Sequence, residues 1–291
     1  MERIQRLCFI LFMLLMILGQ ANIFSQANLS DNQSKKVLIT LKDGSTLQGT
    51  VVTENSLEIN LVTGNIGTIT IKRDQIKSLV PLDSSNLRKG KYWFPNPNYS
   101  RYFIGPGMQL KKGDGYYQNI DLSVNTVSYG FTNFLSVGGG LELYSTLSGY
   151  PIFILMPKLG CKVGKSLWVG GGILYINEFT VLSDFKGLGI GYGSVTIGNE
   201  NSNASLGAGW GFVGSAWSKK PIITLSGMTR VSRGFGLVTE NWLIPTYSVF
   251  SYGVRFMSEK ISIDVGLINS KDIVKIFPIG LPFFLDIVLK F

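Results

Sequence analysis

Histidine is absent from the 291 residues, and cysteine occurs only as Cys8 and Cys161. Histidine is the usual general base and metal ligand near neutral pH, so its absence argues against most hydrolytic and metal-dependent sites. Cys8 falls in a segment that we expect to be removed, which leaves Cys161 as the single cysteine, and one cysteine cannot form an internal disulfide. The sequence therefore excludes a small extracellular scaffold held together by disulfides.

Long apolar runs are also scarce. The one such run, Leu7 to Leu18, is shorter than the roughly 20 residues that a membrane-spanning helix needs. A short basic start precedes it, and small or polar residues follow. Residues 1–25 are therefore predicted to be a secretory signal peptide cleaved after Ser25, or alternatively after Ala21. An uncleaved anchor is the other interpretation, whereas a lipid anchor is not expected because Cys8 precedes most of the apolar run.

Acidic residues are fewer than basic ones. The formal charge is 27 minus 18, or +9, and removal of Arg3, Arg6 and Glu2 with the leader leaves +8. A positive surplus favours acidic partners. For an exported protein, these are membrane lipid and acidic glycolipid such as lipopolysaccharide, and no nucleic-acid partner is expected.

Residues 37–82 are predicted to form a small soluble β unit. Apolar residues alternate with polar ones from Val37 to Leu41, and a hairpin signal follows at Asp43-Gly44. Further turns are expected at residues 54–56 and 63–65. The stretch "LKDGSTLQGTVV" and the apolar hairpin after it resemble SH3-like and Sm-like small barrels. We expect this unit to serve as a spacer or to dock a protein partner.

A linker and an aromatic segment follow at residues 83–99. The first part, "DSSNLRKGK", is polar, and Tyr92 to Tyr99 is rich in aromatic rings and prolines. Such residues are frequent at the membrane–water boundary. A loop packed on a soluble domain is the alternative.

From residue 100 to the end, the sequence alternates apolar residues with small or polar ones. Leu135 to Leu143 and residues 203–212 show the pattern clearly. Segments of about ten residues with this alternation are typical of transmembrane β-barrels, because lipid cannot satisfy an open sheet edge. The fold class is therefore all-β, with a transmembrane antiparallel barrel after a small periplasmic β domain. Aromatic residues expected in the two interfacial girdles are Tyr144, Phe179, Trp217, Trp242 and Tyr247.

The turns predict about twelve strands, with ten or fourteen as alternatives. Strands are expected to begin near Arg101, Gln118, Phe134, Pro151, Ser166, Gly187, Asn203, Lys220, Phe235, Tyr247, Lys260 and Pro282. Every second connection should be a short periplasmic turn, and residues 132–133, 164–165, 232–234 and 258–259 fit this rule. Long outer loops are expected at residues 177–186 and 269–281.

The chain ends on "FFLDIVLKF", in which Phe291, Leu289 and Ile287 share one apolar face. This segment resembles the last strand of Gram-negative outer-membrane proteins, which ends on an aromatic residue after alternating apolar ones. The resemblance implies an outer-membrane location, and it implies that the barrel-assembly machinery reads Phe291, Leu289 and Ile287 as its signal. It also implies that this strand closes the barrel against the first one.

The opposite faces of the predicted strands carry candidate lumen charges. These are Lys158, Lys162, Arg230, Arg255, Glu142, Asp264 and Asp286, together with Lys290 and Asp121. In a barrel of this size they could pair in a plugged interior or line a narrow pore.

Two motifs that suggest nucleotide binding are rejected. The glycines of "GLGIGYG", residues 187–193, alternate strictly and lack the spacing of a dinucleotide fingerprint, so they are predicted to form a lumen-facing row. The stretch "GCKVGKS" lacks the first glycine of a phosphate loop because position 159 is leucine.

These features predict a non-enzymatic protein with no catalytic residue, metal or cofactor. The leading hypothesis is an accessory or structural component of an outer-membrane assembly, with residues 37–82 as a periplasmic docking domain. A passive channel for small solutes is the alternative, and a secreted soluble β-sandwich adhesin is the third hypothesis.

Overall fold

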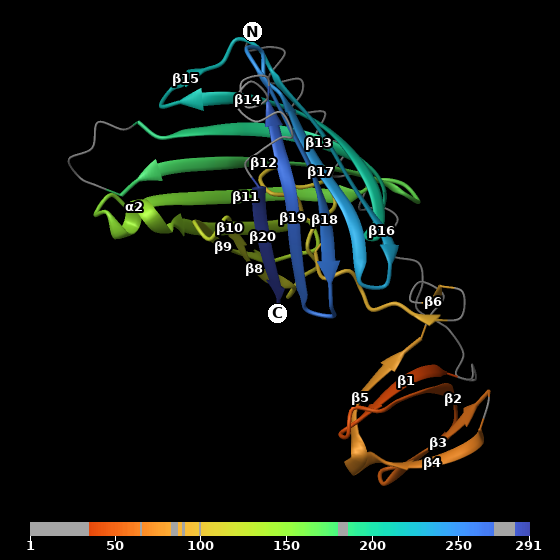
Figure 1. Cartoon of the computed structure of the whole chain (residues 1–291). Helices are drawn as coiled ribbons and strands as arrows, with labels where there is room; N and C mark the ends of the chain where they lie inside the picture. Colours follow the sequence, from red (N-terminus) through yellow and green to blue (C-terminus); the bar gives the residue numbers. More distant parts are fainter. Residues whose placement is uncertain are drawn as a thin grey trace. The chain divides into compact units, whose positions relative to one another are not determined.

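The computed structural model describes residues 35–64, 66–82, 87–88, 91–98, 100–179, 186–270 and 283–291 (Figure 1). These residues divide between Pro95 and Asn96 into two compact units. The expected signal peptide lies outside the described residues. No helix in the described part of the chain is long and apolar enough to cross a membrane.

The smaller unit is a five-stranded antiparallel sheet in the order β4-β3-β2-β1-β5. Its core contains Val37, Ile39, Ile59, Leu61 and Ile71, which the alternating pattern places on one face of the sheet. Its strands are β1 (Lys36–Leu41), β2 (Thr46–Glu54), β3 (Glu58–Thr63), β4 (Gly67–Lys72) and β5 (Ile76–Pro81), with the 3-10 helix η2 (Arg73–Gln75) before the last. A compact β unit thus stands where the sequence predicts one. Its kinship with SH3-like and Sm-like barrels stays a prediction.

Two short strands form within the region of the predicted linker and aromatic segment. The two-residue strands β6 (Leu87–Arg88) and β7 (Lys91–Tyr92) pair with each other. The Arg88 guanidinium lies 4.3 Å from the centre of the Trp93 ring. The start of the aromatic segment is therefore held by a local cation–π contact.

The larger unit is a closed antiparallel barrel of twelve strands, which confirms the expected fold class and strand number. Each strand pairs with its sequence neighbour, and β20 closes the ring by pairing with β8. The barrel strands are β8 (Gly115–Ile120), β9 (Val124–Gly130), β10 (Leu135–Glu142), β11 (Ile152–Lys162), β12 (Leu167–Glu178), β13 (Leu188–Asn199), β14 (Ser202–Val213), β16 (Ile222–Ser232), β17 (Phe235–Leu243), β18 (Ser248–Met257), β19 (Ile261–Ser270) and β20 (Phe283–Lys290). The two-residue strand β15 (Ala216–Trp217) extends β14, and the helix α2 (Leu143–Leu147) follows β10.

The first barrel strand is not where the sequence predicts it. No strand begins at Arg101, and the two strands β8 and β9 occupy the region where one strand is expected to begin at Gln118. Asp121 and Leu122 form the turn between them with φ angles of 53° and 56°. Left-handed turn positions usually carry glycine or asparagine, so this turn has no clear sequence signal.

The connections between strands differ at the two ends of the barrel. The short turns at residues 131–134, 163–166, 233–234 and 258–260 fall where the sequence predicts them, and all lie at one end, here called the short-turn end. The opposite end carries α2 and β15. Residues 180–185 and 271–282, which cover most of the two predicted long loops, lie outside the described residues.

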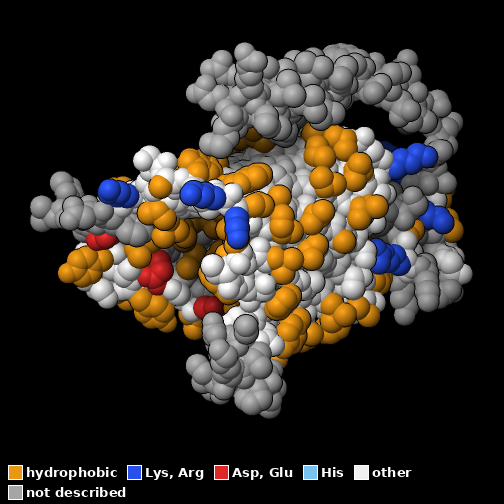
Figure 2. Space-filling view, turned by 90° about the horizontal axis from the view of Figure 1, so that it is seen from above, with side chains coloured by type: hydrophobic (Ala, Val, Ile, Leu, Met, Phe, Trp, Pro, Cys, Tyr) orange, Lys and Arg blue, Asp and Glu red, His pale blue; other side chains and the backbone are white. Residues whose placement is uncertain are grey.

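The strands alternate between an apolar outward face and a largely small or polar inward face. On β18, Phe250, Tyr252 and Phe256 are exposed while Ser251 and Arg255 are buried. Hydrophobic side chains cover much of the face seen in Figure 2, and charged side chains are sparse on it. An apolar exterior around a polar interior is the arrangement of a transmembrane barrel.

Exposed aromatic side chains form a girdle at each end. At the end opposite the short turns, here called the long-loop end, they are Tyr144, Tyr150, Phe179, Trp217 and Tyr247. At the short-turn end they are Tyr129, Phe131, Phe134, Phe256 and Phe291. The prediction for Trp242 is wrong, because this residue points inward and donates a hydrogen bond to Glu240 at 2.9 Å. Such girdles mark the two interfaces of a membrane-spanning barrel.

The glycine row of β13 also faces the opposite way from the prediction. Ile190 is buried inside the barrel, whereas Gly193 is exposed on the outward face with Val195. The rings of Phe212 and Trp217 pack over Gly189 and Gly191 on this outer face. The absence of side chains there makes room for aromatic rings.

Candidate functional site: the occupied interior of the barrel

The interior is occupied by the chain segment that precedes β8, here called the plug segment (residues 96–98 and 100–114). It enters at the short-turn end, where Asn96 donates to the backbone carbonyl of Glu200. It leaves at the same end, where Gly113 donates to the carbonyl of Gly130 at 2.9 Å. The sequence predicts the first membrane-spanning strand in this segment. In the structure, the segment does not face the membrane but fills the lumen.

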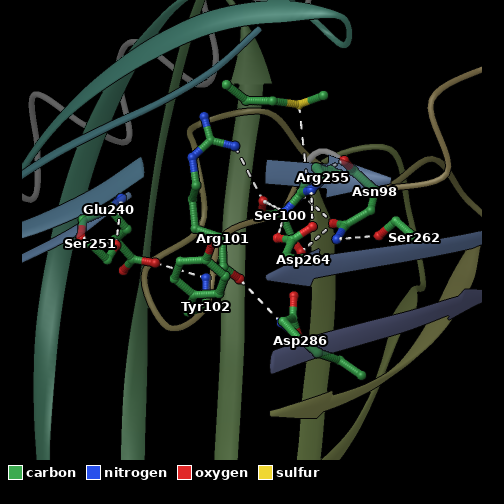
Figure 3. Close-up of polar contacts among 12 residues, drawn as sticks. Asn98, Ser100, Arg101, Tyr102, Glu240, Ser251, Arg255, Ser262, Asp264 and Asp286 are labelled. Atoms are coloured by element: carbon green, nitrogen blue, oxygen red, sulfur yellow. Dashed lines mark hydrogen bonds and ion pairs between the residues drawn. The ribbon is translucent and has the colours of Figure 1, made fainter. Parts of the chain in front are cut away.

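Arg255 anchors the start of the plug segment. Its Nε and Nη2 donate to the two carboxylate oxygens of Asp264, each at 2.6 Å, and its Nη1 donates to the Asn98 carbonyl at 2.5 Å. The Asn98 amide in turn donates to Ser262 Oγ at 2.9 Å. Figure 3 shows these side chains pointing toward one another. Since Arg255 and Asp264 are fully buried, this bidentate ion pair depends on its hydrogen bonds to remain stable.

Glu240 holds the middle of the plug segment. Its carboxylate accepts hydrogen bonds from the backbone nitrogens of Tyr102 at 2.7 Å, Phe103 at 3.3 Å and Ile104 at 2.9 Å. The Trp242 indole supplies a further donor. Hydrogen bonds to a buried carboxylate are stronger than neutral ones, so Glu240 fixes this turn of the chain. Residue 240 is inward because it alternates in phase with Gly236 and Val238.

Apolar contacts support the same region. Ile104 packs with Ile154, Leu174 and Ile190 on the inner wall. The Tyr102 ring meets the Phe284 ring edge to face, with centroids 4.4 Å apart. The interior is therefore packed as well as hydrogen-bonded.

The end of the plug segment runs against a glycine-lined wall. A Cβ at Gly160 would lie 2.5 Å from the Gly107 carbonyl oxygen, and a Cβ at Gly170 would lie 3.0 Å from the Gly107 Cα. Gly107 donates to Thr196 Oγ1 at 2.8 Å, and Lys158 donates to the Met108 carbonyl at 2.6 Å. The small inward residues therefore let the backbone of the plug segment approach the backbone of the barrel wall. A wider, open lumen would not need this close approach.

The predicted lumen charges take several positions. Arg255, Asp264 and Asp286 are fully buried inside the barrel, and Lys158 contacts the plug segment. Arg230 is also buried, at the short-turn end, where it bonds Asn201 and the Arg233 carbonyl. The other four predicted charges do not hold the middle of the plug segment. Lys162 is exposed beside the Trp168 ring, and Glu142 caps α2. Lys290 pairs with Asp114 at the end of the plug segment, and Asp121 accepts a hydrogen bond from the Leu285 backbone.

Asp286 has the fewest partners of the buried charges. One of its oxygens accepts from Gln118 at 2.9 Å, and the other has no hydrogen-bond partner.

The sequence did not predict Gln118 and Glu240 as interior residues, and it placed Asn98 and Arg101 outside the interior. The alternation "FGLVTENWL" contains the signal for Glu240, whereas nothing local marks residues 98–104 as interior.

The predicted assembly residues lie at the barrel seam. Phe291 donates its backbone N–H to the Gly115 carbonyl at 3.0 Å and accepts from Gly115 at 3.2 Å. Leu289 and Phe291 are exposed on the outward face, and Ile287 is partly exposed on the same face. The last strand therefore closes the barrel, while recognition of these residues by assembly machinery stays a prediction.

No metal site is visible in this part of the chain: the described residues contain no group of three or more cysteine, aspartate or glutamate residues arranged to hold an ion.

Comparison with known proteins gave similarity to solved structures only. No family model and no curated protein matches the chain. A KdgM porin in complex with disordered oligogalacturonate is 9% identical and has a TM-score of 0.43, over 61% of this chain and 96% of that one. A loop L8 deletion mutant of OmpT, an outer membrane protein of Vibrio cholerae, is 11% identical with a TM-score of 0.31, over 89% and 97% of the two chains. From its own strand pairing and faces, this chain is an outer-membrane-type β-barrel of twelve antiparallel strands, and residues 96–98 and 100–114 occupy its interior.

Proposed function

We propose that this protein is a non-enzymatic outer-membrane barrel that acts as an accessory or structural component of a larger assembly. One observation carries this proposal: the plug segment occupies the lumen through buried polar anchors, so the barrel is built to be closed at rest. Residues 37–82 serve as a periplasmic domain that docks a protein partner. The expected signal peptide, the outer-membrane-like last strand and the two aromatic girdles support the location in the outer membrane.

The small domain has surface features suited to docking. Val52, Leu57 and Ile66 are 59%, 77% and 70% exposed. Exposed apolar side chains gain free energy when a partner removes them from water. A closed structural barrel that is not a pore has a use for such a domain, because the domain can connect the outer membrane to a periplasmic partner.

Affinity purification from outer membranes in mild detergent tests this proposal. We expect the full chain to be recovered with a stoichiometric partner, and the triple variant Val52→Ser, Leu57→Ser and Ile66→Ser to be recovered without it. Since these side chains are exposed, the variant should keep its fold. The matched control is Phe256→Ser, which removes an exposed apolar side chain from the barrel wall. Recovery of the full chain alone, with no phenotype on deletion of residues 37–82, would contradict the docking role.

The absence of enzymatic activity is supported by the interior itself. Glu240 binds the plug backbone and Asp264 is neutralised by Arg255, so two of the three buried carboxylates are already engaged in holding the structure. A passive channel is the alternative, and it requires the plug segment to leave the lumen. Conductance of the intact protein separates the two functions.

A further inference from the structure

The outward wall of the barrel carries a long apolar hollow. Its larger part has a volume of about 960 Å³ and its smaller part about 640 Å³. Both parts are lined by Ile197, Ala204, Gly227 and Thr239, so they form one continuous trough across the sheet. The rest of the larger part is formed by further residues of β13, β14 and β16 and by residues of β17 to β20.

The strand register explains why the sheet is hollow there. Ala204 pairs with Gly227, Gly227 with Thr239, and Thr239 with Tyr252. These residues form one row across four strands, and three of the four are small. Outward neighbours in directly paired positions lie about 5 Å apart, so a row of small side chains makes a groove one residue wide.

The rows on either side are taller. Leu206 and Leu225 pair on one side of the trough, and Leu237 and Val254 pair on the other. All four belong to the outward face. A groove bounded in this way accepts a single extended hydrocarbon chain, whereas the flat face of another barrel would rest on the taller rows.

Several polar side chains of the trough form hydrogen bonds within the barrel wall. Thr239 Oγ1 donates to the Ser251 carbonyl at 2.5 Å, and the Asn241 amide donates to Thr239 Oγ1 at 2.9 Å. The Ser202 and Thr229 hydroxyls bond each other at 2.7 Å. No charged residue occurs among the described residues that line either part. The trough is therefore largely apolar, and it suits a hydrocarbon occupant better than a polar ligand.

The trough also lies at the depth of lipid hydrocarbon. Its row runs from Ile197, two residues before the end of β13 at the short-turn end, to Tyr252 in the middle of β18. Both positions fall between the two aromatic girdles. The small residues lie nearest the short-turn end, which in outer-membrane barrels faces the periplasm.

We propose that this trough binds one acyl chain of a membrane phospholipid from the periplasmic leaflet. This inference rests on the proposed location of the barrel in an outer membrane, but not on the docking role of residues 37–82. A bound lipid of this kind would differ from the surrounding bilayer lipid by its slow exchange, because its chain is enclosed on three sides by Leu206, Gly227 and Leu237.

The test compares Gly227→Leu with the matched control Gly193→Leu. A Cβ at Gly227 would contact Asn203 O at 3.5 Å and Thr239 Cγ2 at 3.7 Å, so the variant is sterically tolerated and fills the trough. Gly193 is also outward and exposed, lies outside the trough, and its Cβ would meet only Gly170 O at 3.8 Å. Each protein is purified in mild detergent, and phospholipid retained after washing is counted per barrel by native mass spectrometry.

We expect one retained phospholipid in the unmodified protein and in Gly193→Leu, and about tenfold less in Gly227→Leu, the ratio that corresponds to 1.4 kcal/mol. Equal retention in Gly227→Leu would overturn the proposal. So would a dimer of the unmodified protein that Gly227→Leu converts to a monomer, because the occupant would then be a second copy. Outer-membrane fractionation of all three proteins is followed in parallel. Absence of retained phospholipid from the unmodified protein, with correct fractionation, rejects the lipid site alone, whereas absence of the unmodified protein from the outer membrane rejects the proposed function.

Discussion

Arg255 binds both carboxylate oxygens of Asp264 at 2.6 Å, while Asp286, directly opposite Asp264 in the register of β19 and β20, has no arginine of its own. All three side chains are fully buried. Both carboxylates therefore lie near the positive charge of the Arg255 guanidinium, and Gln118 donates a hydrogen bond to Asp286. The same guanidinium binds the Asn98 carbonyl, so the charge balance of the wall and the attachment of the plug segment depend on one residue.

Replacing Arg255 should destabilise the barrel strongly. Arg255→Met leaves Asp264 buried without a counter-ion beside Asp286, and removal of one partner of a buried ion pair typically costs about 3–5 kcal/mol. The double variant Arg255→Met and Asp264→Leu should recover part of this loss, because the carboxylate that Arg255 bonded is removed with it and only Asp286 is left without that arginine. Urea unfolding of the protein in lipid vesicles measures both. A single variant as stable as the unmodified protein would show that the pair is exposed to water.

Glu240→Gln should loosen the plug segment without unfolding the barrel. The amide replaces a carboxylate that accepts three backbone N–H groups, and hydrogen bonds to charged groups contribute about 1.5–3 kcal/mol. Limited proteolysis should therefore cut between residues 100 and 110 faster than in the unmodified protein. Glu142→Gln is the control, because Glu142 caps α2 and has no contact with the plug segment. Equal cleavage rates in all three proteins would show that Glu240 does not hold the plug.

Gly160→Ala should displace the plug segment by steric conflict alone. Its methyl group would lie 2.5 Å from the Gly107 carbonyl oxygen, which is closer than real contacts allow. Gly211→Ala is the control on the same inner face, where the nearest atoms would be 3.7 Å away. We expect a fall in thermal stability or a plug that is accessible to protease for Gly160→Ala only. If the two variants behave alike, residues 105–107 do not run along β11.

Deletion of Phe291 should impair assembly more than the loss of another outward aromatic residue. Phe291 makes two backbone hydrogen bonds to Gly115 at the seam between β20 and β8, and the same residue carries the predicted assembly signal. The measurement is the fraction of heat-modifiable, folded protein in outer membranes. Phe256→Ser is the control, because Phe256 is exposed on the wall away from the seam. Equal folded fractions in the two variants would reject the special role of the C-terminal residue.

The alternation of apolar and small residues was sufficient to predict most barrel strands. On β18, β19 and β20, the predicted outward and inward faces agree with the observed ones. The pattern works there because one face meets hydrocarbon and the other meets a polar interior, so a shift of one residue would bury charges in lipid. The short turns could be predicted for the same reason, since each interrupts a clear alternation.

The plug segment could not be predicted, because its partners are distant in sequence. Residues 101–104 contact Glu240 and Phe284, and no local pattern distinguishes such a segment from a strand. The plug also explains the wrong face of β13. Ile104 packs against Ile190 inside the barrel, so an apolar residue faces inward where a polar or small one is expected. Trp242 is inward for a similar reason, since its indole completes the donors around Glu240.

Single-channel conductance of a locked protein tests the closed, plugged barrel most directly. The Asn98 amide and Ser262 Oγ are 2.9 Å apart, so cysteines at positions 98 and 262 in a Cys161→Ser background, joined by a short bifunctional thiol reagent, tie the plug segment to the wall. The locked barrel should show no steady conductance in a planar bilayer, and the unlocked full chain should show the same closed state at rest. Steady conductance through the locked protein would mean that the lumen is open beside residues 96–98 and 100–114, which would contradict the closed, plugged barrel.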